Sequence, residues 1–437
     1  MGVFDKFRNW LLEPVLNKEQ EAIVKSREYY QGKQKRPLKV KTYDDNLVVN
    51  FCGLIVDRSV SDMVGGGVAF TDLDEADAEY IQAVWDANKQ EILLHRACLS
   101  ASIGGTGYIK ILPDGITDWS GNTLPRLVVV DPAWVTVETH PEDQELVVKY
   151  IIQYSFMEDG KEKTRREEST LQENGTWLVD SYLDQGSGKP VLKDSTPFPY
   201  PFAPIIHWQN LVSLGVYGDP DVTEDVIELQ DKYNFVSANV GKIIRYHAHP
   251  KTVVIGASKS QTTNTAPDEA MFLPAGSDVK NLEMQSDLES SMNFLREMRQ
   301  SMFDITRTVD IDSIQDKIGA LTNFGLRVLY KDALAKIDSK RELFGDMLRE
   351  LNRRLLILHG GNGENPGNVR FMDVLPANEV EEIASLKFDL ETGIASKETA
   401  AETRGYDFEA EQEKIQNEQS QTSNIGALIM QNFNKGL

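Results

Sequence analysis

Apolar positions recur at helical spacing in several long segments of the chain. The clearest stripe lies between Gly218 and Ile244, with spacings that alternate between four and three: Val222, Val226, Leu229, Tyr233, Val236, Val240 and Ile243. Such spacing places these side chains on one face of a single helix. We expect this helix to begin at Asp219 and Pro220, because acidic residues and proline favour a first turn, and to end before Pro250.

The same period predicts three further helices. One covers 74–100, a second covers 286–305 with Leu288, Met292 and Leu295 on one face, and a third runs over about 321–358. Two short strand-like runs, "KTVVIG" and "EAMFLPAG", separate the helix at 219–247 from the helix at 286–305. We therefore expect these two helices to form an antiparallel pair. A projecting pair cannot bury all its sides within one chain, which indicates an oligomer.

Between these helical segments, about 107–210 reads as β structure. Six short β-branched or aromatic runs are bounded by Gly, Pro, Asp or Asn: "GYIKILP", "LPRLVVVDP", "WVTVET", "LVVKYIIQYSF", "TWLVDSYL" and "PIIHWQN". The charged stretch "MEDGKEKTRREEST" is expected to be an exposed loop. A short strand, "VRFMDVLP", and acidic helices follow the long helix. The fold class predicted from this order is α+β with an antiparallel β region.

Charge and composition narrow the classes of function. The chain has 437 residues and a net charge of −22, whereas proteins that grip nucleic acid through phosphates usually carry a basic surface. Nucleic acid is therefore either irrelevant or passes without being gripped. No apolar run reaches the length of a membrane span, and the N-terminal residues lack the apolar core of a signal peptide. Two cysteines predict a reducing compartment without a disulfide framework.

Motifs for catalysis are weak. There is no P-loop, and "SIGGTG" (102–107) leads into a strand, so a turn is a better interpretation than a phosphate cradle. His247 and His249 have the spacing of some metal hydrolases, but a helix C-terminal turn explains them more simply. We expect no catalytic residue, no cofactor and no metal. A metal hydrolase that uses His247 and His249 stays as an alternative.

Several passages, in order, resemble the portal proteins of long-tailed bacteriophages, the head-to-tail connector family. They are "REYYQGKQK", "NFCGLIVDRSVSDMVGGGV", "GDPDVTEDVIELQDKYNFVSANV", "IGALTNFGLRVLYKDALAKIDSKRELFGDMLRELNRRLL" and the acidic passage from "DVLPANEV" to "EKIQNE". Together they span nearly the whole chain. The resemblance implies a portal-type fold that forms a ring, usually of twelve subunits, around a central channel at one capsid vertex.

Mapped onto this sequence, the resemblance implies seven parts. They are an N-terminal arm and wing (1–218), a first stem helix (219–247), a small α/β clip (248–285), a second stem helix (286–305), a tunnel loop (306–319), a long wing helix with a return strand (320–374), and a helical crown with a C-terminal tail (375–437). On this assignment the apolar stripe faces the paired stem helix and a neighbouring subunit.

The resemblance also implies roles for particular residues. The residues expected to line the DNA channel in the tunnel loop are Arg307, Val309, Asp310, Ile311, Asp312, Ser313, Ile314, Gln315, Asp316 and Lys317. The residues expected to dock the motor and the neck in the clip are Lys251, Lys259, Ser260, Gln261, Asp268, Glu269 and Phe272. The stem contact is assigned to the stripe at 222–243 together with Leu288, Met292 and Leu295.

The implied function is passive conduction of double-stranded DNA during packaging and ejection. The implied partners are further copies of the chain, the large terminase subunit, a head-completion or adaptor protein, and the major capsid and scaffolding proteins, with no membrane. The protein would be assembled in the host cytoplasm and reside in the virion. Another virion component, such as an adaptor or a capsid-assembly factor without a channel, is the remaining alternative.

Overall fold

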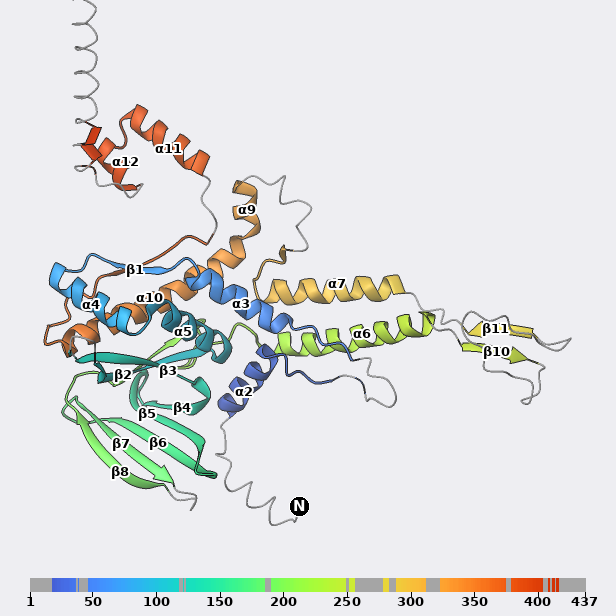
Figure 1. Ribbon diagram of the computed structural model, residues 1–437, viewed down its shortest axis with the longest axis horizontal. Coiled ribbons are helices and arrows are strands. Elements are labelled where there is room, and N and C mark those ends of the chain that lie inside the picture. Colours follow the sequence, from blue (N-terminus) through green and yellow to red (C-terminus); the bar gives the residue numbers. More distant parts are fainter. Residues whose placement is uncertain are drawn as a thin grey trace, which may run out of the picture. The chain divides into compact units, whose positions relative to one another are not determined.

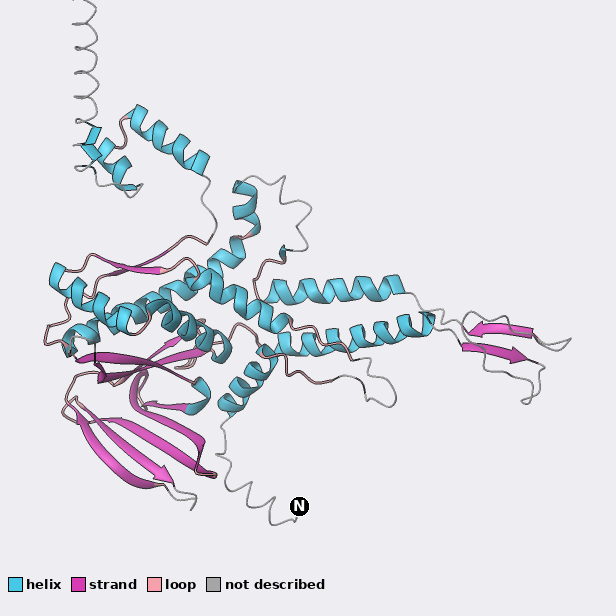
Figure 2. Ribbon diagram, in the orientation of Figure 1, coloured by secondary structure: helices cyan, strands magenta, loops and turns pink. Residues whose placement is uncertain are grey.

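The computed structural model describes residues 18–36, 46–117, 123–184, 190–248, 251–255, 278–282, 288–311, 323–374 and 379–403, with a few isolated positions besides. Helices and antiparallel strands both contribute, so the predicted α+β class is confirmed (Figure 2). The chain divides into two units, residues 1–374 and 375–437. The first unit contains all of the strands named below.

The helices of the first unit are mostly those that the apolar period predicts (Figure 1). They are α2 (Lys18–Tyr30), α3 (Phe51–Val64), α4 (Glu75–Ala87), α5 (Gln90–Gly104), α6 (Glu224–Ala248), α7 (Leu288–Ile305), α9 (Asn323–Leu329) and α10 (Lys331–Leu358), with one 3-10 turn, η1 (Pro132–Trp134). The second unit contains α11 (Glu379–Thr392) and α12 (Lys397–Thr403).

Within the described residues, the strands form four antiparallel sheets. A three-stranded sheet has the order β3 (Thr123–Val130), β2 (Thr106–Thr117), β9 (Ile205–Gln209). A five-stranded sheet follows the chain: β4 (Val135–His140), β5 (Asp143–Glu158), β6 (Lys161–Leu171), β7 (Trp177–Asp184) and β8 (Val191–Phe198). Two ribbons complete the set: β1 (Val68–Thr71) with β12 (Asn368–Phe371), and β10 (Lys251–Ile255) with β11 (Asp278–Leu282).

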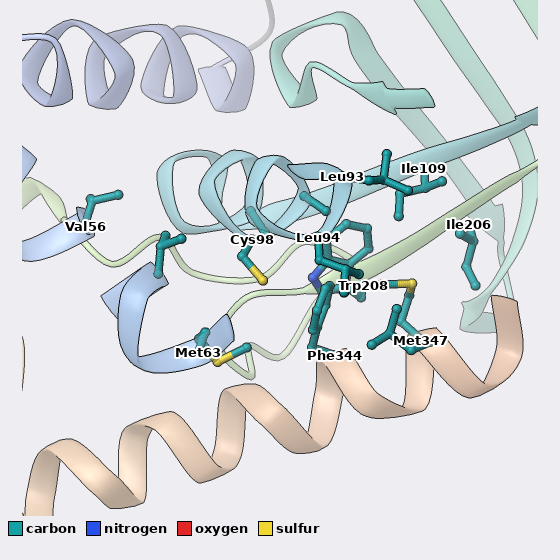
Figure 3. Packing of buried hydrophobic residues seen from close by; sticks show 14 of the residues in the cluster. Val56, Met63, Leu93, Leu94, Cys98, Ile109, Ile206, Trp208, Phe344 and Met347 are labelled. Atoms are coloured by element: carbon teal, nitrogen blue, oxygen red, sulfur yellow. The ribbon is translucent and has the colours of Figure 1, made fainter. Parts of the chain in front are cut away.

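The main hydrophobic core lies where α3, α5 and α10 meet the three-stranded sheet (Figure 3). Trp208 on β9 packs against Phe344 on α10 with ring centroids 5.5 Å apart. Trp85 on α4 is fully buried, and its indole N–H donates to the Asn352 side chain on α10 at 3.0 Å. Helix α10 therefore organises the packing of elements that precede it by more than 100 residues.

The helix predicted over 74–100 is in fact two helices. Lys89 adopts a left-handed conformation with φ of 57°, which ends α4 and starts α5 in a new direction. Asn88 fixes this break to the sheet, because its side chain donates to the Pro125 carbonyl at 2.9 Å and accepts from the Leu127 N–H at 2.8 Å. The apolar period continues across the break, so the pattern alone does not reveal it.

The helix predicted over about 321–358 is also interrupted. Tyr330 has ψ near 0° and separates α9 from α10. The run at 251–256 is confirmed as β10, but its partner β11 was not predicted. The second run that the pattern indicated, "EAMFLPAG", lies outside the described residues.

The prediction of an exposed loop in the charged stretch 157–170 is wrong. Only Asp159 and Gly160 form a turn, and β6 follows in the middle of the five-stranded sheet. Its charges are paired across the fold: Glu167 accepts from Lys110 of the neighbouring sheet at 2.5 Å, and Glu168 forms an ion pair with Lys149 of β5 at 2.6 Å. Opposite charges on adjacent strands stabilise a pairing that the composition of β6 alone disfavours. The exposed edge strand β8 was likewise not predicted.

The segment "SIGGTG" leads from the end of α5 through a turn at Gly105 into β2, as the sequence interpretation favoured. Gly105 has φ of 79°, and a Cβ atom there would lie 2.3 Å from the carbonyl oxygen of Gly218. The reverse also holds, since a Cβ on Gly218 would lie 2.6 Å from the carbonyl of Gly105. The two glycines thus allow the chain just before α6 to lie against the end of α5.

We predict that His207 makes folding sensitive to acid. Its Nδ1 lies 2.7 Å from the Tyr150 hydroxyl, and burial, followed by the charge of Arg354, lowers the pKa of His207 to about 4. Below pH 6.5 the unfolded chain binds a proton that the folded chain does not, so acidification towards pH 4 favours unfolding, by up to about 3 kcal/mol. Urea unfolding of wild type and His207→Gln across this range should show a weaker pH dependence in the variant. If the free energy of unfolding depends on pH equally in wild type and in the variant, the prediction is wrong.

Candidate functional site

Helices α6 and α7 lie side by side and run antiparallel (Figure 1), as the sequence predicted. The start of α6 was placed too early, however. The Ile227 N–H donates to the Thr223 carbonyl at 3.1 Å, and the helix begins at Glu224 rather than at Asp219. The acidic residues before it look like a helix start, but Asp221 has a different use, which is described below.

The predicted apolar stripe has two different environments. Its first members pack into the main core: Val222 and Val226 are buried, and Leu229 and Tyr233 contact the same cluster. Tyr233 meets Phe51 of α3 with ring centroids 5.1 Å apart. Along the rest of the pair, Val240 and Leu295 are buried, Val236, Ile243 and Leu288 are half-buried, and Met292 is 43% exposed. The stripe therefore joins α6 both to α3 and to α7.

Two buried amide side chains on α6 hold the extended segment before α3. Gln230 donates to the Val49 carbonyl at 2.7 Å and accepts from the Phe51 N–H at 3.1 Å. Asn234, one turn later, accepts from the Val49 N–H at 3.1 Å and donates to the Gln34 side chain at 2.6 Å. These bonds satisfy backbone groups that would otherwise be buried without partners, so they fix the position of α6 against this segment.

A buried ion cluster lies at the base of the helix pair. The Asp221 carboxylate contacts Lys336 Nζ at 3.0 Å through Oδ1 and Lys340 Nζ at 2.8 Å through Oδ2. All three side chains are at most 4% exposed. Lys340 also donates to the Ser59 hydroxyl at 2.7 Å and the Ser102 hydroxyl at 3.0 Å. The cluster thus joins α10, α3, α5 and the residue that leads into α6.

The charges in this cluster stabilise one another. Burial alone would raise the pKa of Asp221, but the positive charges of Lys340 and Lys336 and their hydrogen bonds outweigh it and hold that pKa well below its usual range. Burial lowers the pKa of Lys336, and the Asp221 carboxylate opposes that shift. The two cationic partners therefore favour the ionised form of the carboxylate in this buried site.

The described start of the predicted tunnel loop is held against the core. Arg307 has φ of 52°, which turns the chain away from α7. Arg58 of α3 then donates to the Val309 carbonyl at 2.9 Å, and Arg299 of α7 forms an ion pair with Asp310 at 2.7 Å. Asp310 therefore does not face solvent as an unpaired carboxylate, whereas Ile311 is 40% exposed.

The remaining predicted residues of the loop, Asp312, Ser313, Ile314, Gln315, Asp316 and Lys317, lie outside the described residues. In the predicted clip, Lys251 lies in β10. Lys259, Ser260, Gln261, Asp268, Glu269 and Phe272 lie outside the described residues.

For the alternative metal site, His247 lies near the end of α6 and His249 is outside the described part. Within the described part, no group of three or more His, Cys, Asp or Glu side chains could hold a metal ion. Among the helices described, none combines the length and apolar character that crossing a membrane requires.

The sequence did not reveal the residues that organise this site: Asp221, Gln230, Asn234, Lys336 and Lys340. For the four that lie on helices, one signal could have found them. Gln230 and Asn234 fall on the face of α6 that carries Val226, and Lys336 and Lys340 continue the buried stripe of α10 that contains Phe344 and Leu348. Polar residues at core positions of a helix are candidates for specific buried partners.

Comparison with known protein families identifies the chain. Residues 13–424 match the sequence profile of the family described as phage portal protein, SPP1 Gp6-like. Among curated proteins, none matches the chain significantly. Because the family match covers far more than half of the sequence, the chain belongs to the phage portal protein family. This family is structural and non-enzymatic, and membership implies a multimeric ring at the capsid vertex of the virion.

We predict that Asp221→Asn strongly destabilises the fold. The substitution leaves two buried ammonium groups without an anion, a change that typically costs about 3–5 kcal/mol. Asp346→Asn is the matched control, because Asp346 forms an ion pair with Arg349 on the exposed side of α10, where such pairs are worth about 0–1 kcal/mol. Denaturant unfolding of both variants measures the difference. If the free energy of unfolding falls by a similar amount in the two variants, the buried cluster contributes no more to stability than an exposed ion pair.

Proposed function

We propose that copies of this chain form a ring of twelve subunits, whose central channel conducts double-stranded DNA during packaging and ejection. The observation that carries the proposal is the α6–α7 pair, which has apolar side chains on faces that its own chain leaves uncovered. In this assignment α6 and α7 are the stem helices, and the segment from Thr306 onward leads into the tunnel loop.

The exposed apolar side chains support a contact between copies. Phe235 and Ile244 on α6 are 44% and 51% exposed, and Met292 and Phe294 on α7 are 43% and 46% exposed. Other apolar residues of the same helices, such as Val240 and Leu295, are buried within the chain. A helix with apolar residues on more than one face is typical of one that is covered on several sides. A second copy related by rotation would cover one such face with another, and repetition closes a ring.

The other parts follow from the family assignment. The β10–β11 ribbon, between the two stem helices in sequence, corresponds to a clip that would dock the large terminase subunit during packaging and a head-completion or adaptor protein afterwards. The β sheets with α2–α5, α9 and α10 correspond to the wing, which would meet the major capsid and scaffolding proteins. Residues 375–437 correspond to the crown. Assembly would occur in the host cytoplasm.

The acidic character of the chain suits a passive channel. The net charge of −22 repels phosphates, and weak phosphate contact lets a duplex move without the salt-dependent binding that stalls it. Energy for movement would come from the docked motor rather than from this family, which is non-enzymatic.

We predict that Phe235→Asp prevents ring assembly without unfolding the chain. The side chain is 44% exposed in the single chain, so this part of it is available to a second copy; the substitution removes that contact, about 1–2 kcal/mol per contact, and adds a charge there. Met157→Asp, at a 69% exposed site on β5, is the control and should still form rings. Electron microscopy and native mass spectrometry provide the measurement, with a ring and central hole expected for wild type.

Intact rings of the Phe235 variant would count against the stem interface, and a monomeric wild type would reject the proposed function. Val226 is unsuitable for this test because it is fully buried in its own chain.

We also predict that deleting Asp312–Lys317 leaves ring assembly intact but lowers the yield of packaged DNA. The deletion spares Asp310 and its ion pair with Arg299, so the described start of the loop is unaffected. Removal of residues 185–190, which lie between β7 and β8 in sequence and outside the stem, loop and clip assignments, provides a control for the loss of six residues. If the Asp312–Lys317 deletion variant packages full-length DNA at normal yield, this segment has no role in the channel.

A further inference from the structure

One side chain contacts both segments of the chain that meet at the base of the helix pair. Lys336 Nζ lies 3.0 Å from the carboxylate of Asp221, which precedes α6, and donates to the carbonyl oxygen of Thr306, which follows α7, also at 3.0 Å. Its side chain is 4% exposed. A single ammonium group of α10 therefore joins the residue that leads into α6 to the residue that leads out of α7.

Lys340, one helical turn further along α10, contacts different groups. Its three N–H donors are used by Asp221, Ser59 and Ser102, so none is left for α7. Ser59 belongs to α3 and Ser102 to α5. The two lysines therefore share one carboxylate but have separate tasks: Lys340 attaches Asp221 to α3 and α5, whereas Lys336 attaches the end of α7 to Asp221.

The end of α7 is shaped to present its carbonyl to Lys336. The Thr306 hydroxyl donates to the Met302 carbonyl at 2.8 Å, and the Thr308 N–H donates to the Phe303 carbonyl at 2.9 Å. These bonds close the last turn of the helix. The negative end of the helix dipole lies there, so a buried cation at this point is favourable.

We propose that Lys336 is a positioning residue that sets where α7 ends relative to where α6 begins. Without the Lys336 ammonium group, Lys340 still holds Asp221, but the end of α7 loses this polar link to the start of α6. The segment that follows α7, up to Asp310, would keep the contacts of Arg58 and Arg299 and its own bonds to the last turn of α7. Any effect of Lys336 on DNA conduction rests on the proposed function. The test below measures the exchange of backbone amides and involves no DNA.

Hydrogen–deuterium exchange of the assembled full-length protein tests the proposal by comparing Lys336→Met with Lys340→Met. In Lys336→Met, the amides of residues 306–308 should exchange at least about tenfold faster, with a smaller change at Asp221 and Ile227. In Lys340→Met, the Asp221 amide, which donates to the Ser102 carbonyl at 2.9 Å, should be affected first. The two variants should therefore affect the two sets of amides in opposite order, which general destabilisation of the fold would not produce.

Equal acceleration of both sets of amides in Lys336→Met, or unchanged exchange at 306–308, would overturn the proposal. If either methionine variant fails to fold, Lys336→Gln and Lys340→Gln replace the pair. A glutamine at 336 keeps a donor for the Thr306 carbonyl but loses the charge, so the same order of effects is expected with a smaller amplitude. Loss of that order in the glutamine pair would also reject the role of Lys336.

Discussion

The carboxylate of Asp221 lies between the ammonium groups of Lys336 and Lys340 in a place that solvent does not reach. Taking three charges out of water is costly, and only close contact with further hydrogen bonds offsets that cost. Here the serine hydroxyls on α3 and α5 complete the shell around Lys340. The two lysines come from α10, the serines from α3 and α5, and Asp221 from the chain before α6, so the charges are satisfied only when these elements are in one particular arrangement.

Directional polar contacts of this kind fix the position and rotation of a helix, which apolar packing alone does not. Burial of apolar area is roughly indifferent to orientation, and a helix such as α6 could slide or rotate against α3 with little loss. Gln230 and Asn234 remove that freedom, because their side-chain amides form hydrogen bonds with particular backbone groups, such as the carbonyl and the N–H of Val49. The ion cluster does the same for the start of α6. In a ring, a small error in helix direction repeats in every subunit, so such fixed contacts have a clear structural value.

The sequence predicted the elements with strong periodicity and missed those that depend on partners. The apolar stripe of α6 and the β-branched runs of β2, β3 and β5 were sufficient to place those elements. Strand β6 was taken for a loop because its charges read as solvent-exposed, although Glu167 has a cationic partner on the neighbouring sheet and Glu168 has one on the adjacent strand β5. Asp221 was assigned to a helix start because acidic residues favour a first turn. A single sequence shows that a residue is charged, but it does not show which distant residue neutralises it.

The same limit applies to helix breaks. Lys89 and Tyr330 end helices by their backbone conformation, and neither residue type signals a break as glycine or proline would. Within the candidate site, the pairing of α6 with α7 followed from local pattern. The roles of Lys336 and Lys340 required the fold, since lysine at a helical position ordinarily indicates a solvated surface.

The distance along the chain between Asp221 and its partners has a consequence for biosynthesis. Lys340 follows Asp221 by 119 residues, and α10 supplies a large share of the core between α4, α5 and β9. While the ribosome is still translating the segment between them, Asp221 has no cation to meet, and the apolar faces that await α10 stay open. Contacts that are so remote in sequence form slowly, and partly closed chains are prone to associate wrongly. The order of synthesis therefore delays closure of the core until α10 has left the ribosome.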